Sequence, residues 1–478
     1  MTRRRGYLMI VLALVIVVAG AAAVSLREDP QPPADRQRSS QETRPEIPRP
    51  PERSAGATIT GVEQHLKAFA DIARAHGGGR AAGTPGYDAS ADYVIERLER
   101  AGYEVTTQRV SLTAFVERTP SRLSVNGRRI GINRFKVMLF SGSDDVRGNV
   151  ARVSGSAGGC ASSDFEEFPR GSIALVAAAN CTYIEQAANA EAAGATGVLF
   201  TPVQEEAGVG PLRGTLGESS QVSVPALGVT YDLGSRITNG RSVRIQVDAF
   251  KKRVRARNVI AQTASGRDES VVMVGAHLDS AVGSPGINDN ASGSSVILEL
   301  AEALVDKELR NGVRFGWWAA EEYGLLGSIH YVESLGEEER KSIAAYLNFD
   351  MLASPNFVRY VYEGEDEPDG SIAIEDEFRT WFRNRGLAIE GIPLEGRSDH
   401  AAFSRAGIRV GGLFTGANML KTADETEMYG GTPGTGEDAC YHLPCDDLDN
   451  INRAVLKQMT AAIVHVVGVM ARTPGVIP

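Results

Sequence analysis

The chain has 478 residues, of which 42% are hydrophobic and 23% are charged, and this ordinary globular composition excludes wholesale disorder, a collagen repeat and a continuous coiled coil. A formal net charge of −10 argues against a nucleic-acid partner, because proteins that bind nucleic acids carry a basic surface. Four cysteines are too few for a disulfide-dense scaffold, although they allow two bridges.

Residues 1–26 predict a signal peptide or a signal anchor. Arginines at positions 3–5 precede an apolar run over residues 7–24, and alanines at 21–23 offer a cleavage site. A helix that spans a membrane needs about 17–25 apolar residues, so a retained anchor also fits. Both alternatives stay open, and both place the folded part outside the cytoplasm, either secreted or anchored to the membrane through residues 7–24 only.

Residues 27–57 predict a proline-rich, disordered linker. Seven of the 21 prolines lie between residues 28 and 53, where they alternate with charged side chains. Such a segment buries too little apolar surface to offset the entropy lost on ordering, so we expect a tether.

The composition becomes globular at residue 58, and we expect residues 58–118 to form the first part of an α/β domain. Apolar periodicity predicts two amphipathic helices, at 61–76 and 88–101, followed by a strand at 103–110.

Residues 119–250 differ in character and are interpreted as an inserted domain. We expect strands at 173–177, 197–200 and 224–229 and a helix at 185–193. The segment contains no histidine and few clustered carboxylates, which favours a non-catalytic, β-rich insert.

From residue 251 to the end of the chain, apolar strands alternate with helices. This alternation is typical of a largely parallel α/β sheet flanked by helices. The expected strands are 270–276, 313–320, 343–349 and 408–414, and the expected helices are 292–305 and 453–470.

Acidic and imidazole side chains follow the first three of these strands. His277 and Asp279 follow the first strand, the pair Glu321-Glu322 follows the second, and Asp350 follows the third. Ligands of parallel sheets lie beyond the carboxyl ends of the strands, so we expect these side chains to converge. Buried carboxylates would repel one another, and a bound dication removes that cost.

Two further residues complete a candidate metal centre. Asp289 lies in a glycine-rich loop, and His442 lies in a short segment between two cysteines. Imidazole nitrogens and carboxylate oxygens suit zinc, and five ligands can hold two ions if one carboxylate, best Asp289, bridges them. Asp279 is placed to accept the second ring N–H of His277 and so to orient that ligand.

Seven sequence runs carry a resemblance to the co-catalytic zinc aminopeptidases of metallopeptidase family 28, closest to the bacterial secreted leucyl type. These runs are GAHLDS, GINDNASGSS, AAEEYGLLGS, LNFDML, GRSDHAAF, GGLFTGA and CYHLPCDDLDNIN. The resemblance covers residues 254–471 together with 58–118. It implies an exported aminopeptidase with two Zn²⁺ per chain, acting on the N-termini of peptides or proteins and preferring large apolar residues.

The resemblance also implies how the metals are held. One zinc would be bound by His277 and Asp350 and the other by Glu322 and His442, with Asp289 bridging the two.

Four more residues gain roles from the same resemblance. Glu321 would be the general base that takes the proton of the attacking water, and Tyr441 would steady the oxyanion. Arg397 and Phe414 match positions that line the substrate pocket.

The insert resembles a protease-associated (PA) domain, through the run GSIALVAAANCTYIEQAANAEAAGATGVLFTP and the following VSVPALGVT. Two alternatives to an aminopeptidase remain. One is another metallo-exopeptidase or amidohydrolase, such as a carboxypeptidase, and the other is an inactive receptor that carries a PA domain. The complete ligand set argues against the receptor.

The four cysteines predict two disulfides, although four cysteines allow three pairings. Cys440 and Cys445 flank the ligand segment, and a bridge between them would hold it rigid; free thiols or extra zinc ligands are the alternatives. Cys160 and Cys181 would form a second bridge inside the insert. Among the other histidines, His65 is interpreted as a surface residue and His400 as a structural one.

Overall fold

The computed structural model of the chain describes residues 57–474 except 154–157, 179–180, 204–209 and 395. The expected signal or anchor at 1–26, and all of the expected linker except residue 57, lie outside the described residues.

Within the described residues, two helices precede the first strand, and their ends follow from local sequence. α1 (Ile59–Ala75) and α2 (Pro85–Ala101) begin after Thr58 and Thr84, whose side chains accept backbone N–H groups that a helix start leaves unpaired. α2 ends at Gly102, which takes a left-handed conformation with φ of 105° and closes the last turn.

A largely parallel sheet forms the part of the chain that we call the main domain. Four strands, in the order β14-β11-β9-β10, run parallel, and β8 and β12 pair antiparallel with its two edges. Their bounds are β8 (Ser242–Gln262), β9 (Arg267–His277), β10 (Asn311–Trp318), β11 (Ile343–Phe349), β12 (Tyr360–Tyr362), β13 (Glu390–Ile392) and β14 (Val410–Phe414). The expected fold class is confirmed.

Helices cover both faces of this sheet, which explains why its central strands are almost wholly apolar. Val272 and Val274 of β9 belong to the core under α1, α2, α5, α8 and α11, whereas Met273 packs with residues of α6 and α9 on the other face. The remaining helix bounds are α5 (Gly293–Leu304), α6 (Leu326–Ser334), α7 (Glu337–Ser342), α8 (Ser371–Arg383), α9 (His400–Arg405), α10 (Ala423–Tyr429) and α11 (Arg453–Met470).

Among the residues that the structure describes, α11 alone has the length and hydropathy that a membrane span requires. Eleven of its residues are buried in the main domain, including Val455, Met459 and Ile463, so it serves as a core helix.

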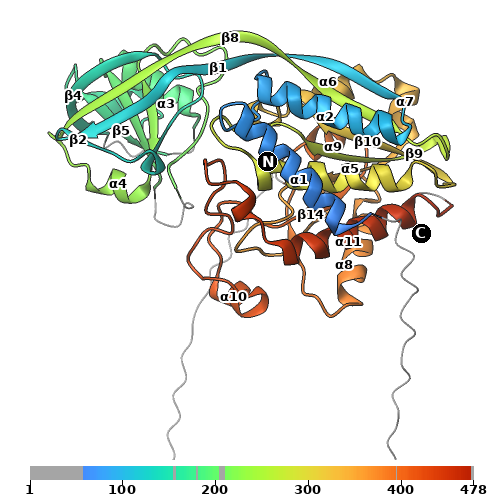
Figure 1. The fold of residues 1–478 in the computed structure, drawn as a ribbon. Helices are drawn as coiled ribbons and strands as arrows, with labels where there is room; N and C mark the ends of the chain where they lie inside the picture. Colours follow the sequence, from blue (N-terminus) through green and yellow to red (C-terminus); the bar gives the residue numbers. More distant parts are fainter. Residues whose placement is uncertain (1–56, 154–157, 179–180, 204–209, 395, 475–478) are drawn as a thin grey trace, which may run out of the picture. The chain divides into compact units, whose positions relative to one another are not determined.

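Two long strands connect the main domain to the insert (Figure 1). β1 (Val105–Val125) pairs antiparallel with β8 over almost its full length, from Val105 opposite Ala261 to Val125 opposite Val243. The domain boundaries expected at 118/119 and 250/251 therefore fall inside strands, with a β-bulge beside Glu117.

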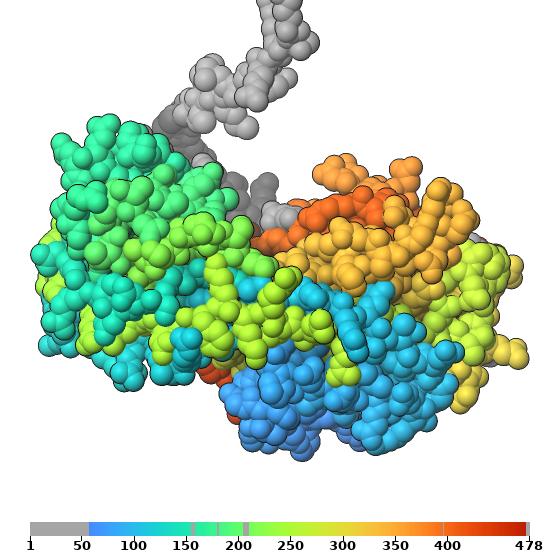
Figure 2. Space-filling view, turned by 90° about the horizontal axis from the view of Figure 1, so that it is seen from above, coloured from blue at the N-terminus to red at the C-terminus, as the bar shows by residue number. Residues whose placement is uncertain are grey.

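The insert is a mixed sheet with two helices and its own apolar cores. Its strands follow the order β8-β4-β5-β6-β7-β3, in which β4 to β7 run parallel. The elements are β2 (Arg128–Arg129), β3 (Phe135–Val137), β4 (Asp144–Arg152), β5 (Ile173–Ala177), β6 (Gly197–Thr201), β7 (Ala226–Val229), α3 (Tyr183–Ala192) and α4 (Tyr231–Arg236). Figure 2 shows the insert, in cyan to green, as a lobe beside the main domain, within one compact unit.

Candidate metal centre and active site

The five expected ligands converge at the carboxyl ends of the central strands. His277 is the last residue of β9, Asp350 directly follows β11, and Glu322 lies in the short turn Glu321–Tyr323 after β10. They form two groups that share Asp289: His277, Asp289 and Asp350 in one, and Asp289, Glu322 and His442 in the other. The ligand atoms of each group lie within 4.8 Å of one another.

The distances between these atoms fit metal binding. Nε2 of His277 lies 3.2 Å from Oδ1 of Asp289 and 3.2 Å from Oδ1 of Asp350. Nε2 of His442 lies 3.0 Å from Oδ2 of Asp289 and 3.1 Å from Oε2 of Glu322. Donors about 2.0–2.2 Å from a tetrahedral ion lie about 3.3–3.6 Å apart, so small adjustments would admit zinc. Asp289 presents one oxygen to each histidine, as a bridging carboxylate must.

The backbone around the ligands adopts uncommon conformations. Ala320 directly before Glu321, Met351 directly after Asp350, and His442 itself have φ between 47° and 58°. Left-handed conformations are uncommon for residues with a side chain and concentrate at functional sites.

Asp279 contacts both the first histidine and the expected base. Nδ1 of His277 lies 3.1 Å from the backbone oxygen of Asp279 and 3.7 Å from its carboxylate. The carboxylate instead accepts the backbone N–H of Glu321 at 3.1 Å. Asp279 thus orients the imidazole chiefly through its carbonyl and positions the turn that carries Glu321.

Sequence reasoning missed two side chains that hold the ligands in place. Ser398 donates a hydrogen bond to Oδ2 of Asp350 at 2.8 Å. Buried Asp446 accepts the backbone N–H groups of Asn288 and Asp289 at 2.8 and 3.1 Å. Both residues lie in the quoted runs GRSDHAAF and CYHLPCDDLDNIN, but sequence spacing does not say which ligand they contact.

The electrostatics of the site also favour a cation. Burial raises the pKa of Glu321 well above its usual range, and it raises the pKa of Glu322. Burial lowers the pKa of His442, but Glu322 and Asp289 outweigh this effect and the value rises to about 9. Among the described residues, Oε1 of Glu322 is buried without a hydrogen-bond partner, so its lone pairs remain for a metal ion.

The sequence and the fold of this chain are similar to those of known proteins. The sequence profile of peptidase family M28 matches residues 258–467, and that of the PA domain matches residues 146–237. An aminopeptidase from Pseudomonas aeruginosa is 42% identical over 425 residues, which cover 85% of this chain and 79% of that protein. The chain belongs to peptidase family M28.

Two further relatives are similar over most of this M28 chain. Leucine aminopeptidase 2 from Trichophyton equinum is 36% identical, covering 87% of this chain and 84% of its own. The solved structure of a zinc aminopeptidase from Bacillus subtilis has a TM-score of 0.66 and 27% identity, covering 88% of this chain and 97% of its own. The expected M28 aminopeptidase family with a PA insert, and the expected enzyme class, are confirmed.

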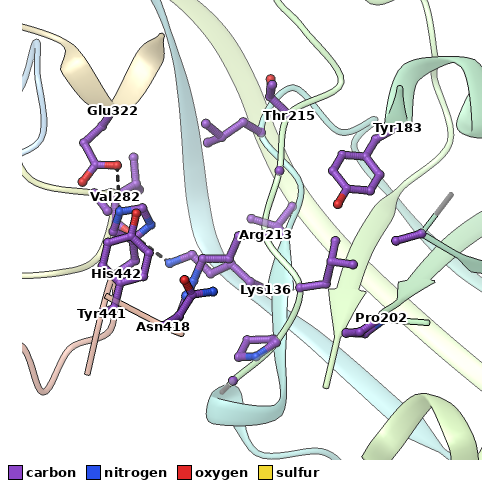
Figure 3. Close-up of a pocket in the computed structure, with 18 of the residues that line it drawn as sticks. Lys136, Tyr183, Pro202, Arg213, Thr215, Val282, Glu322, Asn418, Tyr441 and His442 are labelled. Carbon is purple, nitrogen blue, oxygen red and sulfur yellow. Dashed lines mark hydrogen bonds and ion pairs between the residues drawn. The ribbon is translucent and has the colours of Figure 1, made fainter. Parts of the chain in front are cut away.

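Two cavities meet at the metal ligands of this M28 peptidase. The first, of about 240 Å³, has Glu321 and Asp350 in its wall. Its apolar lining residues include Met351, Ile392, Leu394, Phe414 and Ala417. The second, of about 720 Å³, lies between Glu322 and the insert (Figure 3). Arg397, Tyr441 and His442 line both cavities, and Phe414 lines the smaller one.

The structure contains both expected disulfides, Cys160–Cys181 and Cys440–Cys445. The second bridge closes the segment that carries His442, and the rings of Tyr441 and His442 lie 3.8 Å apart.

The surface position expected for His65 is wrong. Its side chain is 1% exposed, because α1 packs this face against α5, and its Nδ1 lies 2.7 Å from the hydroxyl of Tyr93. His65 also forms a group with Glu299 and Glu302. Glu302, however, already accepts two hydrogen bonds of 2.6 Å from Arg97, so the group is better explained as an ion-pair network.

His400 is buried beside the backbone oxygen of Leu394, as expected of a structural residue.

Proposed function

We propose that this M28 peptidase is an exported aminopeptidase with two zinc ions that releases N-terminal residues with large apolar side chains. The observation that carries the proposal is the pair of ligand groups that share Asp289. In this assignment His277 and Asp350 would hold one ion, Glu322 and His442 would hold the other, and Asp289 would contribute to both.

The side chains around the proposed metal site have different roles in the reaction. When bound, the two zinc ions supply Lewis acidity toward the scissile carbonyl and lower the pKa of water. Glu321, whose pKa is raised by burial, accepts a proton from the attacking water and delivers it to the leaving amine. The hydroxyl of Tyr441 donates a hydrogen bond to the carbonyl oxygen as negative charge develops there.

The smaller cavity supports the preference for an apolar N-terminal residue. The carboxylates of Glu321 and Asp350 attract the free α-amino group, while Phe414, Leu394 and Ile392 surround the first side chain. The relatives named leucine aminopeptidase 2 support the same preference.

Two features support export. The apolar run at residues 7–24 follows three arginines, and the described part contains two disulfides and no free cysteine. Disulfides persist in oxidising compartments, so the folded part works outside the cytoplasm, secreted or anchored.

Metal content and substrate choice test the proposal together. Purified protein should contain about two zinc ions per chain and hydrolyse leucyl-anilide but not N-acetyl-leucyl-anilide, with activity lost to a chelator and regained with zinc. Cleavage of acetylated peptides from the carboxyl end would instead support a carboxypeptidase. Absence of both metal and activity would favour the receptor.

A further inference from the structure

The larger cavity gives the insert a direct part in substrate binding. We propose that Arg213 of the insert binds the C-terminal carboxylate of short peptide substrates, so that the enzyme favours dipeptides and tripeptides with a free carboxyl end. This inference rests on the proposed aminopeptidase function and names its substrate class.

The cavity extends from the metal ligands to the insert. Glu322, Tyr441 and His442 line one end, and Tyr183 and Pro202 of the insert line the other. Figure 3 shows Arg213 between these two ends, and its guanidinium carbon lies 5.7 Å from the centre of the Tyr441 ring. A substrate that leaves the metal centre on the Glu322 side therefore meets Arg213.

A direct contact fixes the insert against the catalytic loops. Lys136 at β3 donates a hydrogen bond of 2.8 Å to the backbone oxygen of Val282, in the loop that follows β9 and Asp279. Because this contact joins the insert to the loop beside the metal ligands, the distance between Arg213 and the site is defined by the fold.

The charges around the cavity favour an anionic group. Among the lining residues that the structure describes, Lys136, Arg213 and Arg397 are cations and Glu322, a proposed metal ligand, is the single carboxylate. This excess is local, since the whole chain has a net charge of −10.

Arg213 itself has hydrogen-bonding capacity to spare. Within the described residues, its Nε and one terminal nitrogen are buried and have no hydrogen-bond partner. Leaving a buried charge unpaired is costly, and a carboxylate matches the two parallel N–H groups of a guanidinium.

The direction of the peptide follows from the two cavities. The amino group and first side chain occupy the smaller cavity beside Asp350 and Phe414, so the remaining residues pass Tyr441 into the larger one. A cavity of about 720 Å³ is of the size that encloses a small ligand. One or two residues, each spanning at most about 3.5 Å, would carry the carboxylate toward Arg213.

A comparison of free and amidated peptides tests the inference on the zinc-loaded enzyme. kcat/KM is measured for Leu-Leu and Leu-Leu-Leu and for the same peptides with a C-terminal amide. In the Arg213→Ala variant we expect kcat/KM to fall about tenfold or more for the free acids, because charged hydrogen bonds contribute at this level, and to change less than twofold for the amides. Arg213→Lys should recover part of the loss, since it keeps the charge but not the paired N–H groups.

A matched control is Arg236→Ala, which removes an exposed arginine of the insert that pairs with Asp232 and does not line the cavity. If Arg213→Ala lowered kcat/KM by the same factor for the free acids and for the amides, so that their ratio stayed as in the wild type, carboxylate recognition by Arg213 would be overturned. A wild-type enzyme inactive on all four peptides would overturn the proposed function itself and this inference with it.

Discussion

Glu321 and Glu322 are neighbours in the sequence, but the structure gives them different surroundings. Oε2 of Glu322 lies 3.1 Å from Nε2 of His442, within one ligand group. Glu321 belongs to neither group, and its backbone is held by Asp279 while its side chain lines the smaller cavity. One carboxylate can therefore bind metal while the other remains free to move a proton.

Glu321→Gln separates these roles. The amide has nearly the same shape but cannot accept a proton, so we expect kcat on leucyl-anilide to fall about 10²–10⁴-fold while zinc content stays near wild type. Glu337→Gln, at a side chain that is 79% exposed, should change nothing. A Glu321→Gln enzyme with full turnover would remove the proposed base.

A second buried carboxyl predicts a pH dependence of stability away from the metals. Burial raises the pKa of Glu437 from 4.5 to about 8, although the Tyr360 hydroxyl donates to it at 2.6 Å. Because the folded state holds this proton more tightly than the unfolded state does, the stabilisation is complete below pH 4.5 and is lost as the pH rises toward 8. The free energy of unfolding should fall by up to about 1.4 kcal/mol per pH unit in this window from this group.

Glu437→Gln removes the titration but keeps the acceptor for Tyr360. Urea unfolding at pH 5, 6, 7 and 8 should therefore show a smaller loss of stability with pH than in the wild type. Glu338→Gln, at a side chain that is 91% exposed, is the control. Parallel pH curves for wild type and Glu437→Gln would contradict the prediction.

The sequence predicted residue types at the site better than it predicted their surroundings. Three candidate ligands, His277, Glu322 and Asp350, could be found because each lies at or just beyond the end of a strongly apolar strand, where a carboxylate or imidazole stands out. Ser398 could not, because a serine in a polar run gives no sign that it will reach Asp350. His65 was misplaced because the sequence does not show that α5 covers that face of α1.

At the scale of elements, apolar periodicity located the strands that carry the ligands. β5, β11 and α11 have the bounds expected from the sequence, since each is a clear apolar run or stripe between polar residues. β1 was expected to end at residue 110 but continues to Val125. Its second half includes exposed polar residues and gains its hydrogen bonds from β8, and pairing with a distant segment leaves no local signal.

The loop closed by Cys440–Cys445 is the element whose rigidity we expect to matter most. It holds His442 at φ of 58°, a conformation that costs about 1–2 kcal/mol for a residue with a side chain. Replacing both cysteines by serine should weaken binding of the zinc that His442 is proposed to hold about tenfold or more, as expected when groups that orient a metal ligand are lost.

This effect can be measured by adding zinc to the metal-free protein and recording the activity at each zinc concentration. Replacing Cys160 and Cys181 by serine is the matched control, since that bridge lies in the insert and should affect stability without changing zinc affinity. If the two double variants lost zinc affinity equally, the loop would have no special role.

At the scale of the molecule, two distant parts of the sequence line one cavity. The candidate metal ligands come from the main domain, whereas Lys136 and Arg213 come from an insert that the sequence predicted to be non-catalytic. The absence of histidines in the insert correctly argued against metal ligands there. It could not show which insert residues face the cleft, because that depends on how β1 and β8 carry the insert back over the main domain.

Metal removal should therefore lower the stability of the whole main domain as well as its activity. Without a cation, Asp289, Glu322 and Asp350 lie close together at the ends of three elements that the core joins. Zinc that binds only the folded state stabilises it by about 4 kcal/mol when its concentration is a thousandfold above Kd. We expect chelation to lower Tm by several degrees and added zinc to restore it.

Two variants serve as controls for this effect. Glu321→Gln should keep the zinc-dependent shift in Tm although it is inactive, whereas Asp289→Asn should lose most of it. Identical unfolding curves with and without zinc would contradict a metal centre formed by these side chains.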